Sequence, residues 1–169
     1  MIGSHGHRLK GIDTALAAFT RALDHLPPFQ FRILGEGPDS YESFARYDAP
    51  LTHKNDVLSW LDGIDVYLQP SRHEGLPRAL IEAMSRACPA LGSDAGGIPE
   101  LLDAENIHKR GDASALSALL IKSVNKKWQR EQAVRNFETA KKYTRENLLP
   151  VREKFWCDFA ARAAKSKNS

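Results

Sequence analysis

The chain has 169 residues, of which 42% are hydrophobic and 27% charged, and its formal net charge is +3. This length suits one globular domain, no apolar run approaches the roughly 18 residues that span a bilayer, and the N-terminus lacks a signal-peptide layout. Two cysteines are too few for a disulfide framework, so we expect a cytoplasmic protein rather than a secreted one.

The charge is unevenly distributed along the chain. Residues 120–169 carry 13 Lys and Arg against 5 Asp and Glu, whereas residues 1–119 carry 11 against 16. The basic end is consistent with solvated faces of terminal helices or with attraction to an anionic membrane surface. No nucleic-acid motif accompanies it, so nucleic acid is not an expected partner.

The chain begins with a stub of strand, a loop and a helix. Only Met1 and Ile2 precede Gly3, although a buried strand usually runs about five or six residues. The abrupt start indicates a chain cut from something longer. Beyond the loop, apolar residues recur at helical spacing and predict the first helix: Ile12, Leu16, Phe19 and Leu23.

Strands and short helices follow. Residues 29–37, "FQFRILGEG", predict a strand that ends in glycines, and residues 39–47, "DSYESFARY", predict a short polar helix. A short strand is expected up to about Thr52, then a helix with Asp56 as its N-cap, and then a strand over residues 65–69.

Residues 71–102, "SRHEGLPRALIEAMSRACPALGSDAGGIPELL", contain the next helix. Pro77 suits its first position. Its apolar stripe comprises Leu76, Leu80, Ala83, Met84 and Ala87. A strand over "PALGSD" and a glycine turn into a short helix over "GGIPELL" come next, and "NIHK" predicts a weak last strand.

Strands alternate with helices throughout residues 1–110, and from Asp112 to about Lys165 the pattern is helical, with breaks near Thr144 and at Pro150. The alternation predicts an α/β fold, a doubly wound, Rossmann-like parallel sheet covered on both faces. Open sheets of this kind bind ligands in the loops at the carboxyl ends of the strands. The loops at that edge are residues 3–10, 35–38, 52–56, 71–77 and 92–99.

Two glutamates, Glu74 and Glu82, stand out near this edge. On one helix they would lie about 12 Å apart at about 1.5 Å per residue, whereas glycosidases hold their carboxyl pair within about 5 to 9.5 Å. A hydrolytic pair is therefore disfavoured. Glu82 lies opposite the apolar stripe, where pairing with Arg78 and Arg86 would be ordinary on a helix surface. Glu74 is either a first-turn acid favoured by the helix dipole or part of an anion-binding loop.

Three histidines, His5, His7 and His53, also lie in loops at this edge. His5 and His7 lack an acidic or cysteine partner at a convincing spacing. We therefore do not expect a metal site.

Several motifs in a fixed order accompany the two glutamates. Pro-Ser precedes the first, seven residues separate the two, and Ala-Met and then Gly-Gly-x-Pro-Glu follow. Upstream lie "IGS", "KGID", "ILGEGP" and "NDVLSWLDGIDVYLQPS". Over roughly residues 1–125 the chain resembles glycosyltransferase family 4, retaining enzymes of the two-domain GT-B fold that use nucleotide sugars. The resemblance implies the C-terminal, donor-binding half, with a Rossmann-like domain over residues 1–145 and a C-terminal helix and tail over residues 146–169.

The resemblance implies roles for five residues. Glu74 would contact hydroxyls of the donor sugar and Lys10 would stabilise the leaving diphosphate, which makes these two the expected catalytic residues. Glu82 would accept hydrogen bonds from the ribose hydroxyls. The backbone N–H groups of Gly75 and Leu76, with the N-terminus of the following helix, would approach the diphosphate.

Other donor-binding residues follow from the same resemblance. Ser4 stands where the family often has arginine, which leaves open what replaces that charge. Lys54 matches a place where family members hold the base through backbone atoms. Gly96 and Gly97 form a turn that either faces the same cleft or is purely structural.

The implied function is donor binding in a retaining sugar transferase of polysaccharide or glycoconjugate synthesis. A sugar would pass from a nucleoside diphosphate sugar, with UDP the first choice, to an acceptor hydroxyl. The acceptor site would lie on an N-terminal domain absent from this chain, so the isolated fragment is expected to be inactive. The nucleotide sugar is a substrate, and neither a cofactor nor a metal is expected.

The last predicted helix, in "NLLPVREKFWCDFAARA", combines apolar and basic residues. In the family such a helix crosses back to the other domain. The alternative is a membrane-facing position near a lipid-linked acceptor, at the inner face of the membrane. Two other functions stay open: a nucleotide-binding module without transfer activity, and a sugar epimerase of the same fold, although an epimerase would not be expected to show this signature.

Overall fold

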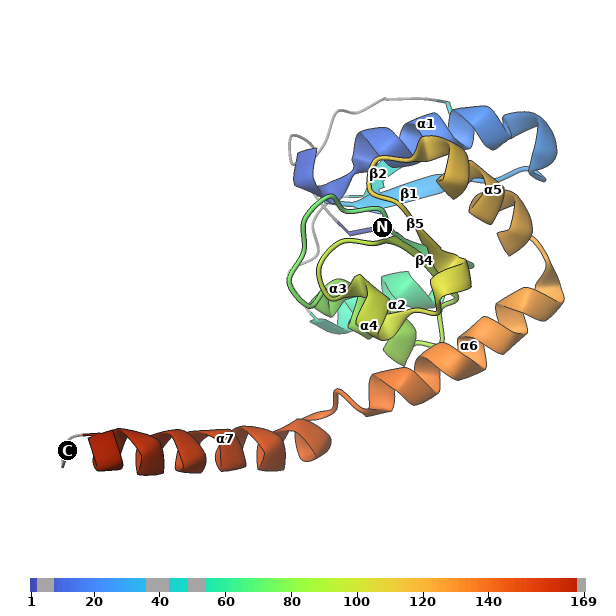
Figure 1. The fold of residues 1–169 in the computed structure, drawn as a ribbon. Helices are drawn as coiled ribbons and strands as arrows, with labels where there is room; N and C mark the ends of the chain where they lie inside the picture. Colours follow the sequence, from blue (N-terminus) through green and yellow to red (C-terminus); the bar gives the residue numbers. More distant parts are fainter. Residues whose placement is uncertain (3–7, 36–42, 49–53, 167–169) are drawn as a thin grey trace.

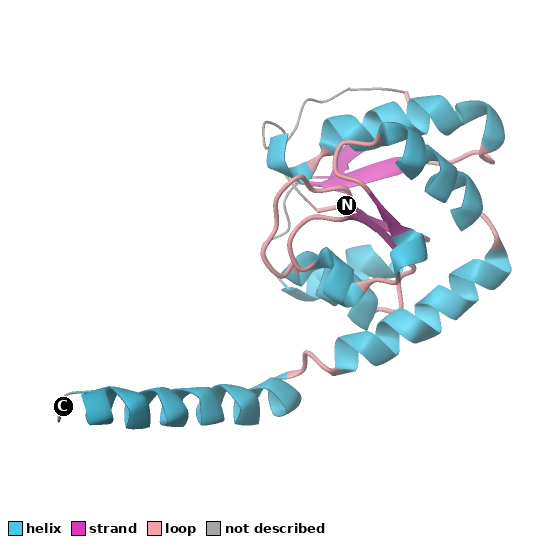
Figure 2. Ribbon diagram, viewed as in Figure 1, coloured by secondary structure: helices cyan, strands magenta, loops and turns pink. Residues whose placement is uncertain are grey.

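Parallel strands alternate with helices in the computed structural model, which describes residues 1–2, 8–35, 43–48 and 54–166 (Figures 1 and 2). The strands are β1 (Phe31–Leu34), β2 (Ala45–Asp48), β3 (Tyr67–Gln69), β4 (Ala90–Ser93) and β5 (Ile107–His108). The α-helices are α1 (Ile12–Ala22), α2 (Lys54–Asp62), α3 (Arg78–Ser85), α4 (Ile98–Leu101), α5 (Ala113–Ser123), α6 (Lys126–Lys141) and α7 (Arg145–Ser166). Short 3-10 helices lie at Arg8–Lys10, Leu23–His25 and Ala104–Asn106.

The strands form two parallel sheets. β1 pairs with β2, and the second sheet has the order β3, β4, β5. Ile2 adds a single parallel bridge to Leu34 at the edge of the first sheet. Parallel pairing throughout these strands agrees with the prediction from the alternation of strands and helices.

Helices cover both faces of the sheets (Figure 1). One hydrophobic core lies under α1 and α5 and includes Ile33, Leu68 and Leu91 from three strands. The other lies under α2, α3, α4 and α6 and includes Leu34 and Tyr67. Consecutive residues of a strand point to opposite faces, so Tyr67 and Leu68 enter different cores. The predicted doubly wound α/β fold is confirmed.

Polar side chains hold α6 against the second sheet. Asn136 is buried, and its amide donates to the Cys88 carbonyl at 2.8 Å, just before β4. The Arg135 guanidinium donates to the Leu101 carbonyl at the end of α4. Because buried polar groups require partners, these contacts fix the position of α6.

The two cysteines lie in different environments. Cys88 is buried, and its thiol donates to the Leu61 carbonyl at 3.4 Å. Burial raises the pKa of this thiol to about 11. Cys157 is exposed on α7, and both thiols are free.

α7 extends away from the rest of the molecule, with the side chains of residues 145–163 exposed (Figure 1). It begins at Arg145, which confirms the break predicted near Thr144, but it continues through Pro150, so the second predicted break is wrong. Pro150 removes one backbone hydrogen bond, to the Glu146 carbonyl in the first turn, and solvent reaches that turn. The domain boundary expected at residue 145 stays a prediction. Among the described helices, none is both long and apolar enough to cross a membrane.

The segment before α2 differs from its prediction. The sequence predicts a polar helix over residues 39–47, but residues 45–47 lie in β2. Phe44, Ala45 and Tyr47 pack against the core under α1 and α5. This tertiary contact overrides the local polar pattern. The strand expected up to Thr52 lies outside the described residues from residue 49 onward.

Two helices begin at positions other than those predicted. α2 begins at Lys54, so Asp56 lies in its first turn, where the helix dipole also favours a carboxylate, instead of capping it. Pro77 is the N-cap of α3, which begins at Arg78. Leu76 is 44% exposed and does not join the apolar stripe.

Replacing Asn136 with alanine would leave the buried Cys88 carbonyl without its donor. We expect the free energy of unfolding to fall by about 1–3 kcal/mol, the usual cost of a buried unsatisfied group. Urea denaturation followed by circular dichroism measures this change. The control is Val134→Ala on the exposed face of α6, where the side chain is 67% exposed and the expected change is within about 0.5 kcal/mol. Unchanged stability of the Asn136 variant would show that the bond does not hold α6.

Candidate functional site

Three loops meet at the carboxyl edge of the strands. They are residues 8–11, residues 70–77 after β3 and residues 94–97 after β4. The Arg72 N–H donates to the Leu9 carbonyl, and the Gly97 N–H donates to the Gly75 carbonyl, each at 2.7 Å. The middle loop is therefore bonded to both of the others. The other edge loops, residues 35–38 and 52–56, lie partly outside the described residues.

A bidentate ion pair strengthens the contact between the first two loops. The Arg72 guanidinium donates to both carboxylate oxygens of Asp13 at 2.8 Å and to the Arg8 carbonyl at 2.9 Å. Asp13 lies in the first turn of α1, where the helix dipole favours a carboxylate. The arginine hydrogen bonds lower the pKa of Asp13 more than burial raises it.

Two glycines allow the loops to approach closely. Gly11 has φ +69°, and a Cβ there would lie 2.0 Å from the Pro70 carbonyl oxygen. Gly96 has φ +52°, and its Cβ would lie 2.0 Å from the Glu74 carbonyl oxygen. Both positions therefore require glycine. The turn at Gly96 and Gly97 thus has a structural reason for its glycines, and its part in a ligand cleft stays a prediction.

Three donors converge on one oxygen of Glu74. The Lys10 ammonium, the Gln69 amide and the Ser71 hydroxyl each lie 2.8 Å from Glu74 Oε1. The Glu74 side chain is 11% exposed and that of Lys10 is 35% exposed. The structure therefore brings together the two residues expected to be catalytic. No described residue donates to Oε2, which is left as an acceptor.

The contacts of Glu74 continue into the sheet. The buried Tyr67 hydroxyl donates to Gln69 Oε1 at 3.1 Å, and the Ser93 hydroxyl donates to the Ser71 carbonyl at 2.5 Å. The sequence pattern did not single out Tyr67 or Gln69 as site residues. A signal was present, since Gln69 is a polar residue at the end of an otherwise apolar strand, "VYLQ".

The hydrogen bonds keep Glu74 ionised. Burial raises the pKa of this carboxyl, but the hydrogen bonds from Lys10 and Ser71 and the Lys10 charge outweigh it, so that the pKa lies below its ordinary value. Tyr67 shows the opposite effect. Burial, and then the nearby charges of Glu74 and Glu82, raise the pKa of its hydroxyl well above its usual range. Both carboxylates therefore act on the same buried hydroxyl.

Glu82 lies on α3 and is partly exposed. Pairing with the neighbouring arginines is not what the structure shows. Arg86 instead forms a bidentate ion pair with Asp62, with distances of 2.6 and 2.7 Å, and among the described residues the Glu82 carboxylate forms no ion pair. The structure therefore does not support the interpretation of Glu82 as a helix-surface residue paired with arginines. Its carboxylate remains a hydrogen-bond acceptor.

The other predicted site residues are placed as follows. Gly75 is exposed, and a Cβ there would meet nothing within 4 Å. Lys54 is the first residue of α2 rather than part of a loop, because the helix begins two residues before its expected cap. Ser4 lies outside the described residues, together with His5, His7 and His53. Within the described part of the chain, no group of three or more His, Cys, Asp and Glu side chains could hold a metal ion; the expectation of a metal-free site stays a prediction.

This edge combines features that suit an anion with hydroxyl groups. The first N–H groups of α3 lack intrahelical partners, and the positive end of the helix dipole lies beside exposed Gly75. The Lys10 ammonium adds a full positive charge. Glu74 supplies a carboxylate oxygen that accepts from hydroxyls.

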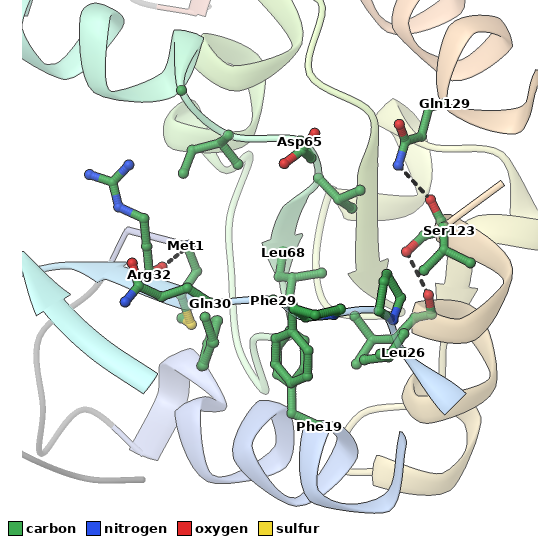
Figure 3. Close-up of a pocket in the computed structure, with 18 of the residues that line it drawn as sticks. Met1, Phe19, Leu26, Phe29, Gln30, Arg32, Asp65, Leu68, Ser123 and Gln129 are labelled. Carbon is green, nitrogen blue, oxygen red and sulfur yellow. Dashed lines mark hydrogen bonds between the residues drawn. The ribbon is translucent and has the colours of Figure 1, made fainter. Parts of the chain in front are cut away.

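A cavity of about 660 Å³ lies elsewhere, at the amino edge of the sheets (Figure 3). No residue of the three loops lines it. This cavity is therefore separate from the candidate site.

Comparisons with known proteins agree on one family. The family model described as "Glycosyl transferases group 1" matches residues 1–126. The amylovoran biosynthesis glycosyltransferase AmsK of Erwinia amylovora is 37% identical over 133 residues, which cover 67% of this chain and 32% of that protein. The curated relatives matched include glycosyltransferases of polysaccharide biosynthesis. Across these relatives the chain spans 15% to 42% of their length.

Two solved structures share the fold. The C-terminal domain of the group 1 glycosyl transferase LpcC from Francisella tularensis superposes with a TM-score of 0.73 at 19% identity, covering 85% of each chain. HepE of Anabaena, solved in complex with UDP-glucose, has a TM-score of 0.75 at 15% identity over 95% of this chain and 48% of its own. The predicted match to the C-terminal half of a GT-B fold is confirmed.

A paired substitution tests the close approach at Gly96. Gly96→Ala introduces both an unfavourable φ and a contact of 2.0 Å with the Glu74 carbonyl. Gly111→Ala is the control, because Gly111 has φ +77° but nothing within 4 Å of its Cβ position. We expect the control to lose about 1–2 kcal/mol, the cost of a left-handed residue, and Gly96→Ala to lose clearly more. Equal losses in urea denaturation would show that the loops can separate without cost.

A second substitution tests what keeps Glu74 ionised. Lys10→Met removes a hydrogen bond and a charge that lower the pKa of Glu74, whereas the effect of burial, which raises it, remains. The pKa of Glu74 should therefore rise in a carbon-13 NMR titration. The lowered pKa gives stability that is complete above the unfolded pKa and is lost as pH falls. The variant should therefore lose less stability on acidification than the parent.

The control for this titration is Lys127→Met, at a lysine that is 84% exposed and lies 3.9 Å from Glu131. It should leave the pKa of Glu74 unchanged. A Glu74 pKa that stays unchanged in the Lys10 variant would mean that the ion pair does not persist in solution.

Proposed function

The chain belongs to the group 1 glycosyl transferases, and on that premise we propose that it binds the nucleoside diphosphate sugar for transfer to an acceptor hydroxyl in polysaccharide or glycoconjugate synthesis. The observation that carries the proposal is the Lys10–Glu74 pair, 2.8 Å apart at the carboxyl edge and beside the N-terminus of α3. It places a cation for the diphosphate next to a carboxylate for the sugar hydroxyls.

The donor would lie across the loops that meet at this edge. The N–H groups of Gly75 and Leu76 and the N-terminus of α3 bind the diphosphate. Glu74 accepts hydrogen bonds from sugar hydroxyls through Oε2. Glu82 on α3 accepts hydrogen bonds from the ribose hydroxyls. The backbone at Gly96 closes the sugar side of the site.

The transfer would keep the anomeric configuration. The bond from the anomeric carbon to the phosphate oxygen breaks, and the acceptor oxygen bonds to the same face of that carbon. The acceptor proton passes to the departing phosphate oxygen, so no side chain of this domain acts as a nucleophile. Lys10 stabilises the negative charge that develops on the diphosphate. The diphosphate is neutralised by this side chain and the α3 dipole, without a metal.

UDP is the proposed donor nucleotide. The fold neighbour HepE was solved with UDP-glucose, which supports this choice of nucleotide but not of sugar. A nucleotide-binding module without transfer activity is the alternative function. Glu74 separates the two, because a pure nucleotide binder gains nothing from a carboxylate directed at the sugar.

The donor site forms one wall of a larger active site in this proposal. The acceptor would bind to an N-terminal domain of the same protein. α7 offers that domain a surface, because three of its exposed aromatic side chains contact one another: Phe155, Trp156 and Phe159. We place the enzyme in the cytoplasm, at the inner face of the membrane, where basic residues of α7 such as Arg152 and Lys154 suit an anionic surface.

Calorimetric titration with UDP and several UDP sugars tests the assigned roles. Glu82→Gln should weaken UDP and UDP sugars alike, by about tenfold or more, because hydrogen bonds to a charged group contribute about 1.5–3 kcal/mol. Glu74→Gln should leave UDP affinity unchanged and abolish the preference among sugars. Glu131→Gln, on the outer side of α6, is the control. Loss of UDP affinity in the Glu74 variant, or no loss in the Glu82 variant, would reverse the assignment.

Transfer activity tests the need for a second domain. We expect the 169-residue chain to bind the donor but to show negligible transfer, because the acceptor site is missing. A radiolabelled UDP sugar with a membrane extract as acceptor source provides the assay. Measurable transfer by this chain alone would contradict the two-domain proposal.

A further inference from the structure

Three polar side chains lie in a row that leads along β3 to Glu74. Tyr67 and Gln69 are two residues apart on the strand and therefore point to the same face of the sheet, and Ser71 in the following loop continues the row. All three residues are at most 1% exposed. Buried polar groups require hydrogen-bond partners, and these side chains find them in one another and in Glu74.

Each hydrogen bond in this row has a fixed direction. The oxygen of the Gln69 amide can only accept, so the Tyr67 hydroxyl donates to it, at 3.1 Å. The nitrogen of the amide faces the other way and donates to Ser71 Oγ at 2.9 Å and to Glu74 Oε1 at 2.8 Å. The Ser71 hydroxyl accepts one of these bonds and donates its own hydrogen to Glu74 Oε1. The row therefore ends on one oxygen of Glu74.

The reverse orientation of the Gln69 amide would be unfavourable. The amide oxygen would then face Glu74 Oε1 with no hydrogen between them, and two buried acceptors would each lose a hydrogen bond. The Tyr67 hydroxyl opposes this reversal, because it supplies the hydrogen that the amide oxygen accepts. Burial raises the pKa of Tyr67 well above its usual range, so the hydroxyl keeps that hydrogen.

The orientation of the amide matters for the carboxylate that it contacts. Oε1 of Glu74 accepts from Lys10, Gln69 and Ser71, so turning the carboxylate away would break three hydrogen bonds. Oε2 is therefore held in one direction. An acceptor with a fixed direction distinguishes a sugar that places a hydroxyl against it from a sugar that does not.

We propose that Tyr67 and Gln69 are positioning residues for the donor sugar: the Tyr67 hydroxyl sets the orientation of the Gln69 amide, and the amide holds the Glu74 carboxylate in the direction that selects among sugars. This inference rests on the proposed function, which assigns the sugar hydroxyls to Glu74. Tyr67 acts only through Gln69, and neither residue contacts the donor. The competing interpretation is that both side chains only satisfy buried polar groups and contribute stability.

A double-mutant cycle in the donor-free chain tests the positioning itself. The variants are Tyr67→Phe, Gln69→Met and the two combined, and the readout is the pKa of Glu74 in a carbon-13 NMR titration. Gln69→Met removes a hydrogen bond that lowers this pKa, so the pKa should rise. Tyr67→Phe should also raise it, although Tyr67 donates to Gln69 and not to Glu74. In the combined variant Tyr67→Phe should add nothing to the effect of Gln69→Met.

Two outcomes of this cycle would overturn the proposal. One is a pKa of Glu74 that stays unchanged in both single variants, because the row would then not hold the carboxylate. The other is an effect of Tyr67→Phe that persists in the combined variant, because Tyr67 would then not act through Gln69.

Asn136→Ala is the matched control for the loss of a buried hydrogen bond. Asn136 is as deeply buried as Tyr67, and its bond to the Cys88 carbonyl lies outside the row. The control should lower the stability of the chain without changing the pKa of Glu74 or the preference among sugars. A change in sugar preference as large as that of Tyr67→Phe would show that lost stability alone explains the effect, and would contradict positioning.

Calorimetric titration with UDP, UDP-glucose and UDP-galactose tests the consequence for the sugar. Tyr67→Phe and Gln69→Met should leave the affinity for UDP unchanged and bring the Kd values of the two UDP sugars closer together, by roughly threefold or more. An unchanged ratio of these Kd values in both variants would overturn the proposal. A parent chain that binds neither UDP sugar, or binds both equally, would instead contradict the proposed function, and the NMR titration would then decide the positioning alone.

Discussion

The convergence of three donors on one oxygen of Glu74 is the constraint on which the candidate site depends. Lys10 comes from the first loop, Gln69 from the end of β3, and Ser71 from the loop between β3 and α3. Their bonds hold an ionised acid at an edge where burial would otherwise favour its neutral form. The backbone contact at Gly96 then fixes the next loop against the same residue. The geometry at the N-terminus of α3 follows from these contacts.

The sequence was sufficient for the parts of the fold that depend on local pattern. Alternating strands and helices predicted parallel sheets with helices on both faces, and the tendency of open parallel sheets to bind ligands at the carboxyl ends of their strands predicted the edge where the candidate site lies. The sequence did not predict strand β2, because Ala45 and Tyr47 are held in it by packing against a core built from residues far away in the chain. The sequence also did not identify Gln69 as a site residue. Its role depends on hydrogen bonds with Tyr67 and Glu74, and a sequence does not show where those side chains point.

The two edges of the sheets have different physical character. At the carboxyl edge, glycines and short hydrogen bonds draw the loops together and present charge and acceptors to solvent. At the amino edge lies a cavity of about 660 Å³, lined by apolar residues such as Phe19 and Leu68 and by charged residues such as Arg32 and Asp65. β3 connects the two edges, because it runs from the cavity wall at Leu68 to Gln69. The roles assigned to Glu74 and Glu82 stay predictions until donors are titrated.

The contrast between the two thiols gives this molecule a single natural site for attaching a fluorescent dye. Cys88 is buried with its pKa raised to about 11, so the reactive thiolate is scarce there, while Cys157 stands in solvent. A maleimide fluorophore will therefore attach to α7 alone, next to Trp156 in the chain. Whatever surface covers that helix, protein or lipid, will shift the colour and anisotropy of the dye without a single engineered residue.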